Sequence, residues 1–192
     1  MKNMKKTLCL LLAVLMTVSL LAGCGKKDDD NADSKKVFTV GIDAEYPPFS
    51  YLGDDGSYTG FDIEIAQAAC DQLGWEMKVF PVNWDQKLTQ LDAKECDCIW
   101  SGMTILDSMK EAGYTLSAPY YDNTQVIMVK EGSDIKSSAD LAGKVVAVQL
   151  GTSGDALLSE DGDLASLSTT FKSLVRSDSV LKCFTELSGG AV

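Results

Sequence analysis

Small hydroxyl and glycine residues follow an apolar segment near the middle of the chain. Ser101, Gly102 and Thr104 come directly after Cys98–Trp100, a segment that is typical of a strand. A loop at the end of such a strand offers hydroxyls and backbone groups that can bind a carboxylate or an ammonium group. The same residue types also make an ordinary tight turn. Residue type and spacing therefore leave a ligand loop and a plain turn as alternatives.

Two further strand ends carry residues that suit a small charged molecule. Asp43 follows the strand expected at Val37–Ile42, where its carboxylate can accept from an amine or instead cap a turn. Gly151 and Thr152 open the helix expected after Val145–Val148, and the N-terminal dipole of a helix favours an anion. A free amino acid needs donors for its carboxylate, acceptors for its ammonium and walls for its side chain.

Composition excludes several kinds of chemistry. The 192 residues include no histidine, which rules out Ser-His-Asp and Cys-His catalysis and histidine-ligated metal sites. The formal net charge of -11 repels a phosphate backbone, so no nucleic-acid partner is expected. No paired carboxylates stand at evident catalytic spacing, although Asp43 and Glu45 could act as acid and base if the fold carried an enzyme.

The N-terminal 36 residues are expected to lie outside the folded part. Lys2, Lys5 and Lys6 precede the apolar run Leu8–Leu20, which is short for a membrane span and is typical of a signal peptide. The run ends in Leu21–Cys24, whose small residues before a cysteine resemble the lipobox of bacterial lipoproteins. An ordinary membrane anchor is the alternative. The pattern predicts a signal peptide at 1–23, lipid on the cysteine at position 24 and a polar, flexible tether at 24–36.

Four cysteines lie in the part of the chain that is expected to fold: Cys70, Cys96, Cys98 and Cys183. Cys96 and Cys98 are two residues apart, so on a strand they face the same side. Because the chain has no Cys-x-x-Cys pair and no histidine, buried free thiols are favoured over a metal site. No metal and no other cofactor is expected. A disulfide stays open in an exported protein, and its pairing cannot be deduced from the sequence.

From Val37 onward, apolar segments alternate with helical patterns, which predicts an α/β fold with a largely parallel sheet. Asp62 is expected to cap a helix that begins at about Ile63 and stops at Gly74. A second helix is expected to be lined by Trp84, Leu88 and Leu91. The prolines in 46–49 predict irregular backbone, and 54–57 predicts a turn. Strands are expected at Val37–Ile42, Met77–Phe80, Cys98–Trp100, Gln125–Val129 and Val145–Val148.

Several segments carry a family resemblance through their order and spacing. They are Asp43–Phe49, Gly60–Ile65, Asp97–Ile105, Ser117–Tyr121, Asp140–Lys144 and Val146–Thr152. Together they resemble the polar amino acid substrate-binding proteins of ABC importers, solute-binding protein family 3. The resemblance covers residues 37 to 192, and the lipobox agrees with the place of that family outside the cell.

The resemblance implies a two-lobe, type II periplasmic-binding-protein-like fold. In that family two α/β lobes, joined by two hinge strands, close on a ligand in the cleft between them. Lobe 1 is then expected at 37–123, and 124–192 holds a hinge strand at Thr124–Val129 and part of lobe 2. Relatives usually continue with an acidic strand and a return crossing. The chain is therefore expected to be C-terminally truncated, with the second lobe and the return crossing incomplete.

The resemblance also implies individual ligand contacts. Tyr46 and Phe61 hold positions at which the family sandwiches the ligand side chain, with core packing as the alternative. Gln149 stands where the family reads the ligand side chain, and Ser153 where a backbone or hydroxyl contact is expected. The expected ligand-binding residues are Asp43, Tyr46, Phe61, Ser101, Gly102, Thr104, Lys110, Gln149 and Ser153.

One position departs from the family motif. An arginine normally follows the Thr104 position and clamps the ligand carboxylate with two parallel hydrogen bonds. Counting forward from Thr104 places Met109 there, and counting back from Ser117 places Lys110 there. Lysine supplies charge but not the planar fork of arginine. Lys110 is therefore expected either to replace the clamp or to be a solvated surface charge.

The expected function is capture of a small polar solute, an amino acid above all, for an ABC importer. The expected partners are the amino acid, the permease subunits, and the membrane through lipid on Cys24. The expected location is the extracytoplasmic face of the cell membrane, and no enzymatic activity is expected. The alternative is a dehydratase-like enzyme on the same fold that uses carboxylates of the cleft.

Overall fold

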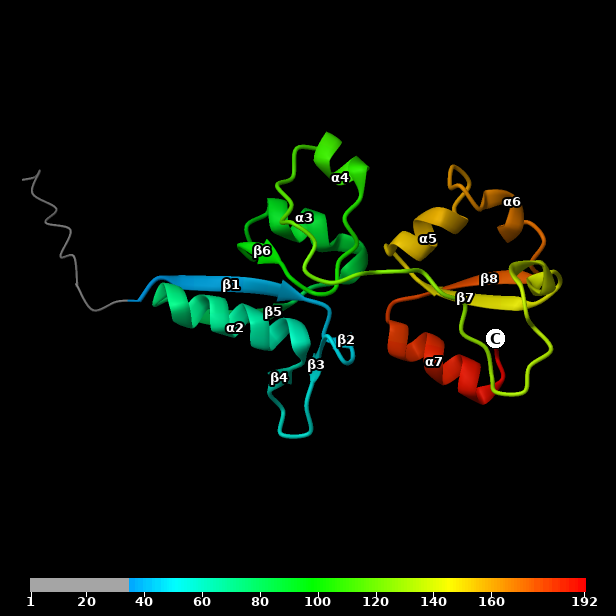
Figure 1. Cartoon of the computed structure of the whole chain (residues 1–192), viewed down its shortest axis with the longest axis horizontal. Helices are drawn as coiled ribbons and strands as arrows, with labels where there is room; N and C mark the ends of the chain where they lie inside the picture. The colour runs from blue at the N-terminus through cyan, green and yellow to red at the C-terminus, as the bar shows by residue number, and fades with distance from the viewer. Residues whose placement is uncertain (1–34) are drawn as a thin grey trace, which may run out of the picture. The chain divides into compact units, whose positions relative to one another are not determined.

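The computed structural model describes residues 35–192. The expected signal peptide, the lipidation of Cys24 and nearly all of the tether therefore lie outside the described residues. Among residues 35–192, no helix combines the length and the apolar character that a membrane span requires. Figure 1 shows the helices and strands of this part along the chain.

A three-stranded parallel sheet, here called the N-terminal sheet, forms the first core. Strand β1 (Val37–Ile42) lies between β5 (Glu76–Pro81) and β6 (Cys98–Ile99), and both neighbours run parallel to it. The core is centred on Val40 and Ile42, which are fully buried. Because all three strands run the same way, their carboxyl ends meet at one edge of the sheet.

Helix α2 (Phe61–Leu73) packs against this core through Ile63 and Ala66. It begins two residues before the predicted start, and Asp62 does not cap it. The amides of Phe61 and Asp62 donate instead to the backbone carbonyls of the Pro48–Phe49 turn at 3.0 and 2.9 Å. These bonds satisfy the first orphan amides of the helix, so the Asp62 side chain is not needed as a cap. The predicted stop at Gly74 is confirmed, because that residue is left-handed with φ 70°.

Short elements complete the N-terminal half. Strands β2 (Glu45–Tyr46), β3 (Ser50–Leu52) and β4 (Tyr58–Thr59) form a small antiparallel sheet. The 3-10 helix η1 (Trp84–Gln86) runs into α3 (Lys87–Asp92), which confirms the second predicted helix. Helix α4 (Asp107–Glu111) follows the loop after β6.

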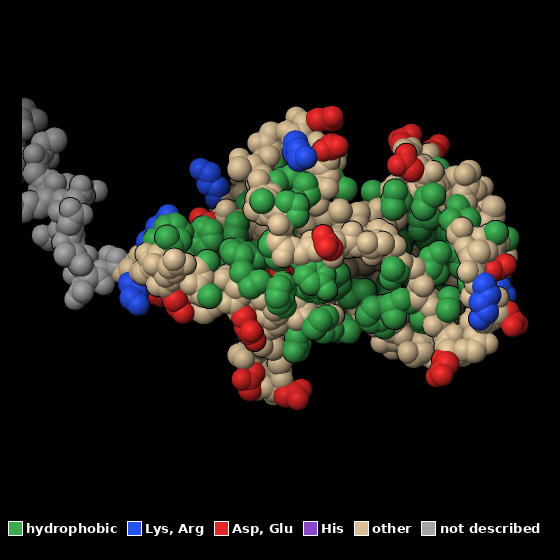
Figure 2. Space-filling model, in the orientation of Figure 1, with side chains coloured by type: hydrophobic (Ala, Val, Ile, Leu, Met, Phe, Trp, Pro, Cys, Tyr) green, Lys and Arg blue, Asp and Glu red, His purple; other side chains and the backbone are tan. Residues whose placement is uncertain are grey.

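The predicted strand at Gln125–Val129 is wrong. This segment has no strand structure, and within residues 115–129 the structure records no backbone-to-backbone hydrogen bond. Its apolar side chains are exposed, with 74% of Val126 accessible to solvent. A strand requires a hydrogen-bonded neighbour, and none of the described residues supplies one here. Hydrophobic side chains accordingly form much of the surface visible in Figure 2.

A second parallel sheet, here called the C-terminal sheet, consists of two strands. Strand β7 (Val145–Gln149) pairs in parallel with β8 (Ser173–Ser177) over five residues on each strand. The elements around it are η2 (Ser138–Leu141), α5 (Ser153–Leu158), α6 (Ala165–Ser168) and α7 (Val180–Gly189). The strands of the N-terminal and C-terminal sheets are parallel and alternate with helices, so the predicted α/β class is confirmed.

Candidate functional site

A buried hydrogen bond joins the carboxyl ends of the two parallel sheets. Asp43 follows β1 of the N-terminal sheet, and Gln149 is the last residue of β7 of the C-terminal sheet. The Nε2 of Gln149 donates to Oδ2 of Asp43 at 2.7 Å, although the two residues lie 106 positions apart. Both side chains are buried. Parallel strands offer ligands the loops at their carboxyl ends, and here two such sets of loops adjoin.

A cavity of about 800 Å³ opens at this junction. It also continues past the apolar side chains of the C-terminal sheet and α7, among them Val148 and Phe184. A volume of this size is in the range of small-molecule sites. Six of the predicted ligand-binding residues line it: Asp43, Tyr46, Gly102, Thr104, Gln149 and Ser153.

Asp43 is held from both of its carboxylate oxygens. Oδ1 accepts from the backbone amide of Glu45 at 2.9 Å, and Oδ2 accepts from Gln149. The turn role that the sequence left open is therefore present, and the same carboxylate lines the cavity. Glu45 is exposed and is not among the lining residues. The carboxylate pair considered for acid–base chemistry therefore does not face a common cavity.

Ser101 lies beneath the cavity and does not line it. Its side chain is buried, and its hydroxyl accepts from the backbone amide of Asp43 at 3.0 Å. It also shares a hydrogen bond with the hydroxyl of Ser50, which in turn donates to the backbone carbonyl of Asp43. The hydroxyl predicted to contact ligand thus positions the end of β1. Ser50, which sequence reasoning did not single out, helps Ser101 to position the backbone of Asp43.

Gly102 brings the backbone close to an aromatic wall. Its φ is +57°, and a Cβ at this position would lie 2.8 Å from Cε1 of Tyr46. The Tyr46 ring stacks on Phe49 with 5.1 Å between centroids, and Tyr46 lines the cavity. Burial, together with the negative charges of Asp43 and Asp62, raises the pKa of Tyr46, so its phenol stays neutral.

Phe61 belongs to an aromatic cluster at the edge of the site. Its ring lies edge-on to Phe49 at 6.2 Å and to Tyr121 at 5.8 Å, and 40% of Phe61 is exposed. Phe61 does not line the cavity, and Phe49 lies between its ring and that of Tyr46 in the aromatic cluster. Tyr120, another member, donates its hydroxyl to the buried Oδ1 of Asp62 at 2.8 Å. Burial raises the pKa of Asp62 despite this hydrogen bond.

Thr104 and Ser153 form a second polar junction between the two halves of the chain. Their hydroxyls are 3.0 Å apart, and both residues line the cavity. The side-chain amide of Asn123 also donates to Oγ1 of Thr104 at 2.7 Å. Asn123 was not predicted, since an asparagine before an apolar segment is equally typical of a turn.

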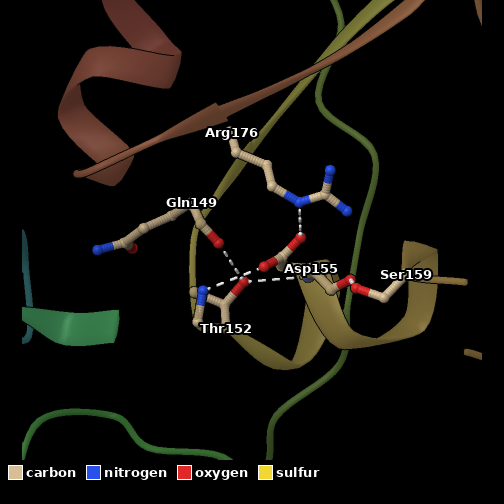
Figure 3. Close-up of polar contacts among 6 residues, drawn as sticks. Gln149, Thr152, Asp155, Ser159 and Arg176 are labelled. Carbon is tan, nitrogen blue, oxygen red and sulfur yellow. Dashed lines mark hydrogen bonds and ion pairs between the residues drawn. The ribbon is translucent and has the colours of Figure 1, made fainter. Parts of the chain in front are cut away.

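The loop after β7 is shaped by a buried carboxylate, as Figure 3 shows. Thr152 donates its hydroxyl to the carbonyl of Gln149 at 2.8 Å and accepts from the amide of Asp155 at 3.2 Å. Asp155 Oδ2 accepts from the amide of Gly151 at 3.2 Å, and its Oδ1 accepts from Nε of Arg176 on β8 at 2.6 Å. The carboxylate of Asp155 therefore fixes the backbone that carries Gln149 and Ser153 at the cavity.

The two positions considered for the missing arginine have different surroundings. Met109 is buried and lines the cavity. Lys110 is an exposed residue of α4, where its Nζ pairs with Asp107 at 2.9 Å, and it is not among the lining residues. This placement agrees with the surface-charge alternative for Lys110.

A buried lysine that sequence reasoning missed lines the cavity. Lys87 is 6% exposed, and its Nζ donates to the carbonyls of Trp84 at 3.0 Å and Gly151 at 2.7 Å. Burial lowers the pKa of Lys87, while the charges of Asp85 and Asp43 oppose that shift. A signal was available, because Lys87 falls three residues after Trp84 on an otherwise apolar helix face.

The four cysteines of the described residues are free thiols. Burial raises the pKa of Cys98 to about 12, and the pKa values of Cys70, Cys96 and Cys183 are raised as well. A thiol held as far from ionisation as Cys98 is a poor nucleophile. Within residues 35–192 no group of three or more potential metal ligands comes together.

The chain belongs to the bacterial extracellular solute-binding proteins, family 3, whose sequence pattern it matches over residues 38–184. It is 39% identical over 146 residues to the L-cystine-binding protein TcyJ of Escherichia coli strain K12, covering 72% of this chain and 54% of that protein. It is 38% identical over 149 residues to the arginine-binding extracellular protein ArtP of Bacillus subtilis strain 168, covering 78% and 57%. The chain thus spans little more than half the length of these curated relatives.

Solved structures agree on the fold. The structure of holo ArgBP from T. maritima matches with a TM-score of 0.68 and 36% identity, over 80% of this chain and 65% of that chain. An ancestral arginine-binding protein bound to arginine matches with a TM-score of 0.73 and 32% identity, over 82% and 68%. These neighbours are periplasmic-binding-protein-like, so the predicted type II fold class is confirmed.

Proposed function

We propose that this protein is an extracytoplasmic binding protein that captures an amino acid in the cavity between the strand ends of its two parallel sheets. The observation that carries the proposal is the bond between Gln149 and Asp43, because it brings the loops of both sheets to one buried polar site. The relatives named above bind cystine or arginine by their names. Both ligands are α-amino acids, which carry an ammonium and a carboxylate group. The cavity wall likewise holds the carboxylate of Asp43 and the ammonium of Lys87.

Within this proposal each lining group has a distinct role. Asp43 accepts from the ligand ammonium, Tyr46 packs against the ligand side chain, and the adjacent Thr104 and Ser153 hydroxyls bind its polar atoms. Gln149 connects Asp43 to the C-terminal sheet and reads the ligand side chain. Ser101 and Gly102 shape the loop rather than donate to ligand.

We further propose delivery of the amino acid to an ABC permease from the outer face of the cell membrane. The support is the family and the apolar run that ends in Leu21–Cys24. Lipid on Cys24 would then anchor the protein. Replacing Cys24 by alanine is expected to release the protein from the membrane fraction into the periplasm or medium. Retention of that variant in the membrane would contradict the lipid anchor.

Calorimetric titration of the full chain with L-arginine, L-cystine and the remaining standard amino acids tests the binding function. Asp43→Asn removes the buried charge while keeping a similar shape, and we expect at least a tenfold loss of affinity. Asp54→Asn, on the exposed turn after β3, is the matched control and should leave affinity unchanged. Binding that is insensitive to Asp43→Asn would place the ligand elsewhere, and no binding by any amino acid would refute the proposal.

An enzyme on the same fold is the second candidate. One structural neighbour, with a TM-score of 0.73 and 32% identity, is the ancestral amino acid-binding protein AncCDT-1, a precursor of cyclohexadienyl dehydratase. The exposure of Glu45 favours binding over acid–base chemistry here, because only Asp43 of that pair lines the cavity. Recovery of each bound amino acid unchanged after prolonged incubation would distinguish binding from turnover.

A further inference from the structure

Lys87 is a buried cation with no carboxylate partner among the described residues. The ion pairs of residues 35–192 involve Lys110, Arg176 and Lys182, and none involves Lys87. Yet Lys87 is 6% exposed and lines the cavity. Buried charges in proteins are nearly always paired, because removing an ammonium group from water is costly. The position of Lys87 therefore calls for a negative partner that residues 35–192 do not provide.

The contacts of Lys87 orient its ammonium group and leave it one free donor. The group carries three N–H bonds, and the carbonyls of Trp84 and Gly151 accept two of them. The ammonium also lies 4.7 Å from the centre of the Trp84 ring. These contacts tie α3 to the loop after β7, so Lys87 is held by both halves of the site.

Charges near Lys87 do not neutralise it. Asp85 and Asp43 raise its pKa, but burial has the larger effect and lowers it. Neither carboxylate lies within ion-pair distance of Lys87. An incoming carboxylate would meet an ammonium group that is already dehydrated, and charge-assisted hydrogen bonds are strongest in that setting.

Other cations suit an anion in the cavity less well. Lys130 and Lys144 also line the cavity, but both are exposed to solvent. The Nε of Arg176 is occupied by Asp155, and Arg176 is not among the lining residues. Met109, which is buried in the cavity wall, carries no charge.

We propose that Lys87 is the anion-binding group of the cavity and receives the carboxylate of the bound amino acid. The identity of the ligand as an amino acid rests on the proposed function, but the presence of an anion site at Lys87 does not. Any small carboxylate that enters the cavity should bind the Lys87 ammonium. Asp43 and Lys87 then form a pair of opposite charges in one wall, which matches the two charges of an α-amino acid.

The first test uses sodium acetate and its neutral isostere acetamide as probes of the wild-type chain. The ¹⁵Nζ resonance of Lys87 is identified by its loss in Lys87→Met. We expect acetate to shift that resonance with saturation, while acetamide does not shift it and the resonance of exposed Lys78 does not respond to either. An unmoved Lys87 resonance at saturating acetate would overturn the proposal, and this result is independent of which amino acid binds.

The second test compares L-arginine with L-argininamide, which lacks the carboxylate. Lys87→Met is expected to weaken L-arginine binding about ten- to hundredfold and L-argininamide binding less than twofold. Lys78→Met is the matched control, and Lys87→Arg keeps the charge should the methionine variant fold poorly. Selective loss of L-arginine binding in Lys110→Met, with Lys87→Met unaffected, would assign the carboxylate to Lys110 instead. If the wild type responds to acetate at Lys87 but binds no amino acid, the proposed function fails while the anion site stands.

Discussion

Replacing Gly102 by alanine tests how the loop after β6 positions the aromatic wall. The added methyl group would lie 2.8 Å from Cε1 of Tyr46, closer than non-bonded carbons approach one another. Gly102 also has a φ of +57°, a left-handed conformation that costs an alanine roughly 1–2 kcal/mol. The ring must therefore move from its place, and its stack on Phe49 is worth about 0.5–1.5 kcal/mol.

Gly74→Ala separates these two costs. Gly74 has a similar φ of +70°, but a Cβ built there meets nothing within 4 Å. The Gly74→Ala variant should therefore be destabilised only by the left-handed backbone conformation, by roughly 1–2 kcal/mol. Gly102→Ala should lower the free energy of unfolding by about 1.5–3.5 kcal/mol in total, since the aromatic contact is lost as well.

Urea titration of both variants measures the two free energies of unfolding, and calorimetry measures amino acid binding. We expect Gly102→Ala to be the less stable by about 0.5–1.5 kcal/mol and to bind more weakly, because Tyr46 lines the cavity. Gly74→Ala, at the far end of α2, should bind as the wild type does. Equal destabilisation with unchanged binding in Gly102→Ala would refute the contact between Gly102 and Tyr46.

Three further predictions concern buried polar groups. Arg176→Met should lower the free energy of unfolding by about 1–2 kcal/mol, since it removes a charged partner of Asp155; a urea titration within 0.5 kcal/mol of wild type would contradict this. Tyr120→Phe should cost about 1–3 kcal/mol in the same assay, because the buried Asp62 loses its side-chain hydrogen bond. Burial raises the pKa of Cys98 from 9.0 to about 12, so the folded state keeps a proton that the unfolded state releases across that range. Stability should therefore fall as pH rises from 9 to 12, and less steeply in Cys98→Ala; identical pH profiles would be the contrary result.

Local sequence patterns correctly predicted apolar strands that have a pairing neighbour in the structure. The strand predicted at Val37–Ile42 has those bounds, and the one at Val145–Val148 extends by a single residue. Gln125–Val129 is equally apolar, yet it is not a strand. A ladder depends on a neighbour, and the composition of a segment does not reveal whether that neighbour exists.

The candidate site was predictable at the level of loops and much less at the level of single contacts. Asp43 and Thr104 follow strands, and the position of a residue after a strand is readable from the sequence. The hydroxyl of Ser101 is equally suited to a ligand and to a backbone amide, and only the fold directs it to Asp43. Lys87 was missed because a charge on a helix is ordinarily solvent-exposed, whereas here the loop at Gly151 covers it.

The unpaired backbone of residues 115–129 should make this segment sensitive to proteolysis. Its amides should exchange with solvent far faster than those of either ladder, and its exposed apolar side chains suit proteases that cleave after aromatic or aliphatic residues. One cut there would leave β5-β1-β6 whole in one fragment and β7-β8 whole in the other. Three hydrogen bonds would then join two separate chains: Asp43 with Gln149, Lys87 with Gly151, and Thr104 with Ser153. Nicked protein thus offers a direct way to weigh how strongly the two halves of the site hold each other.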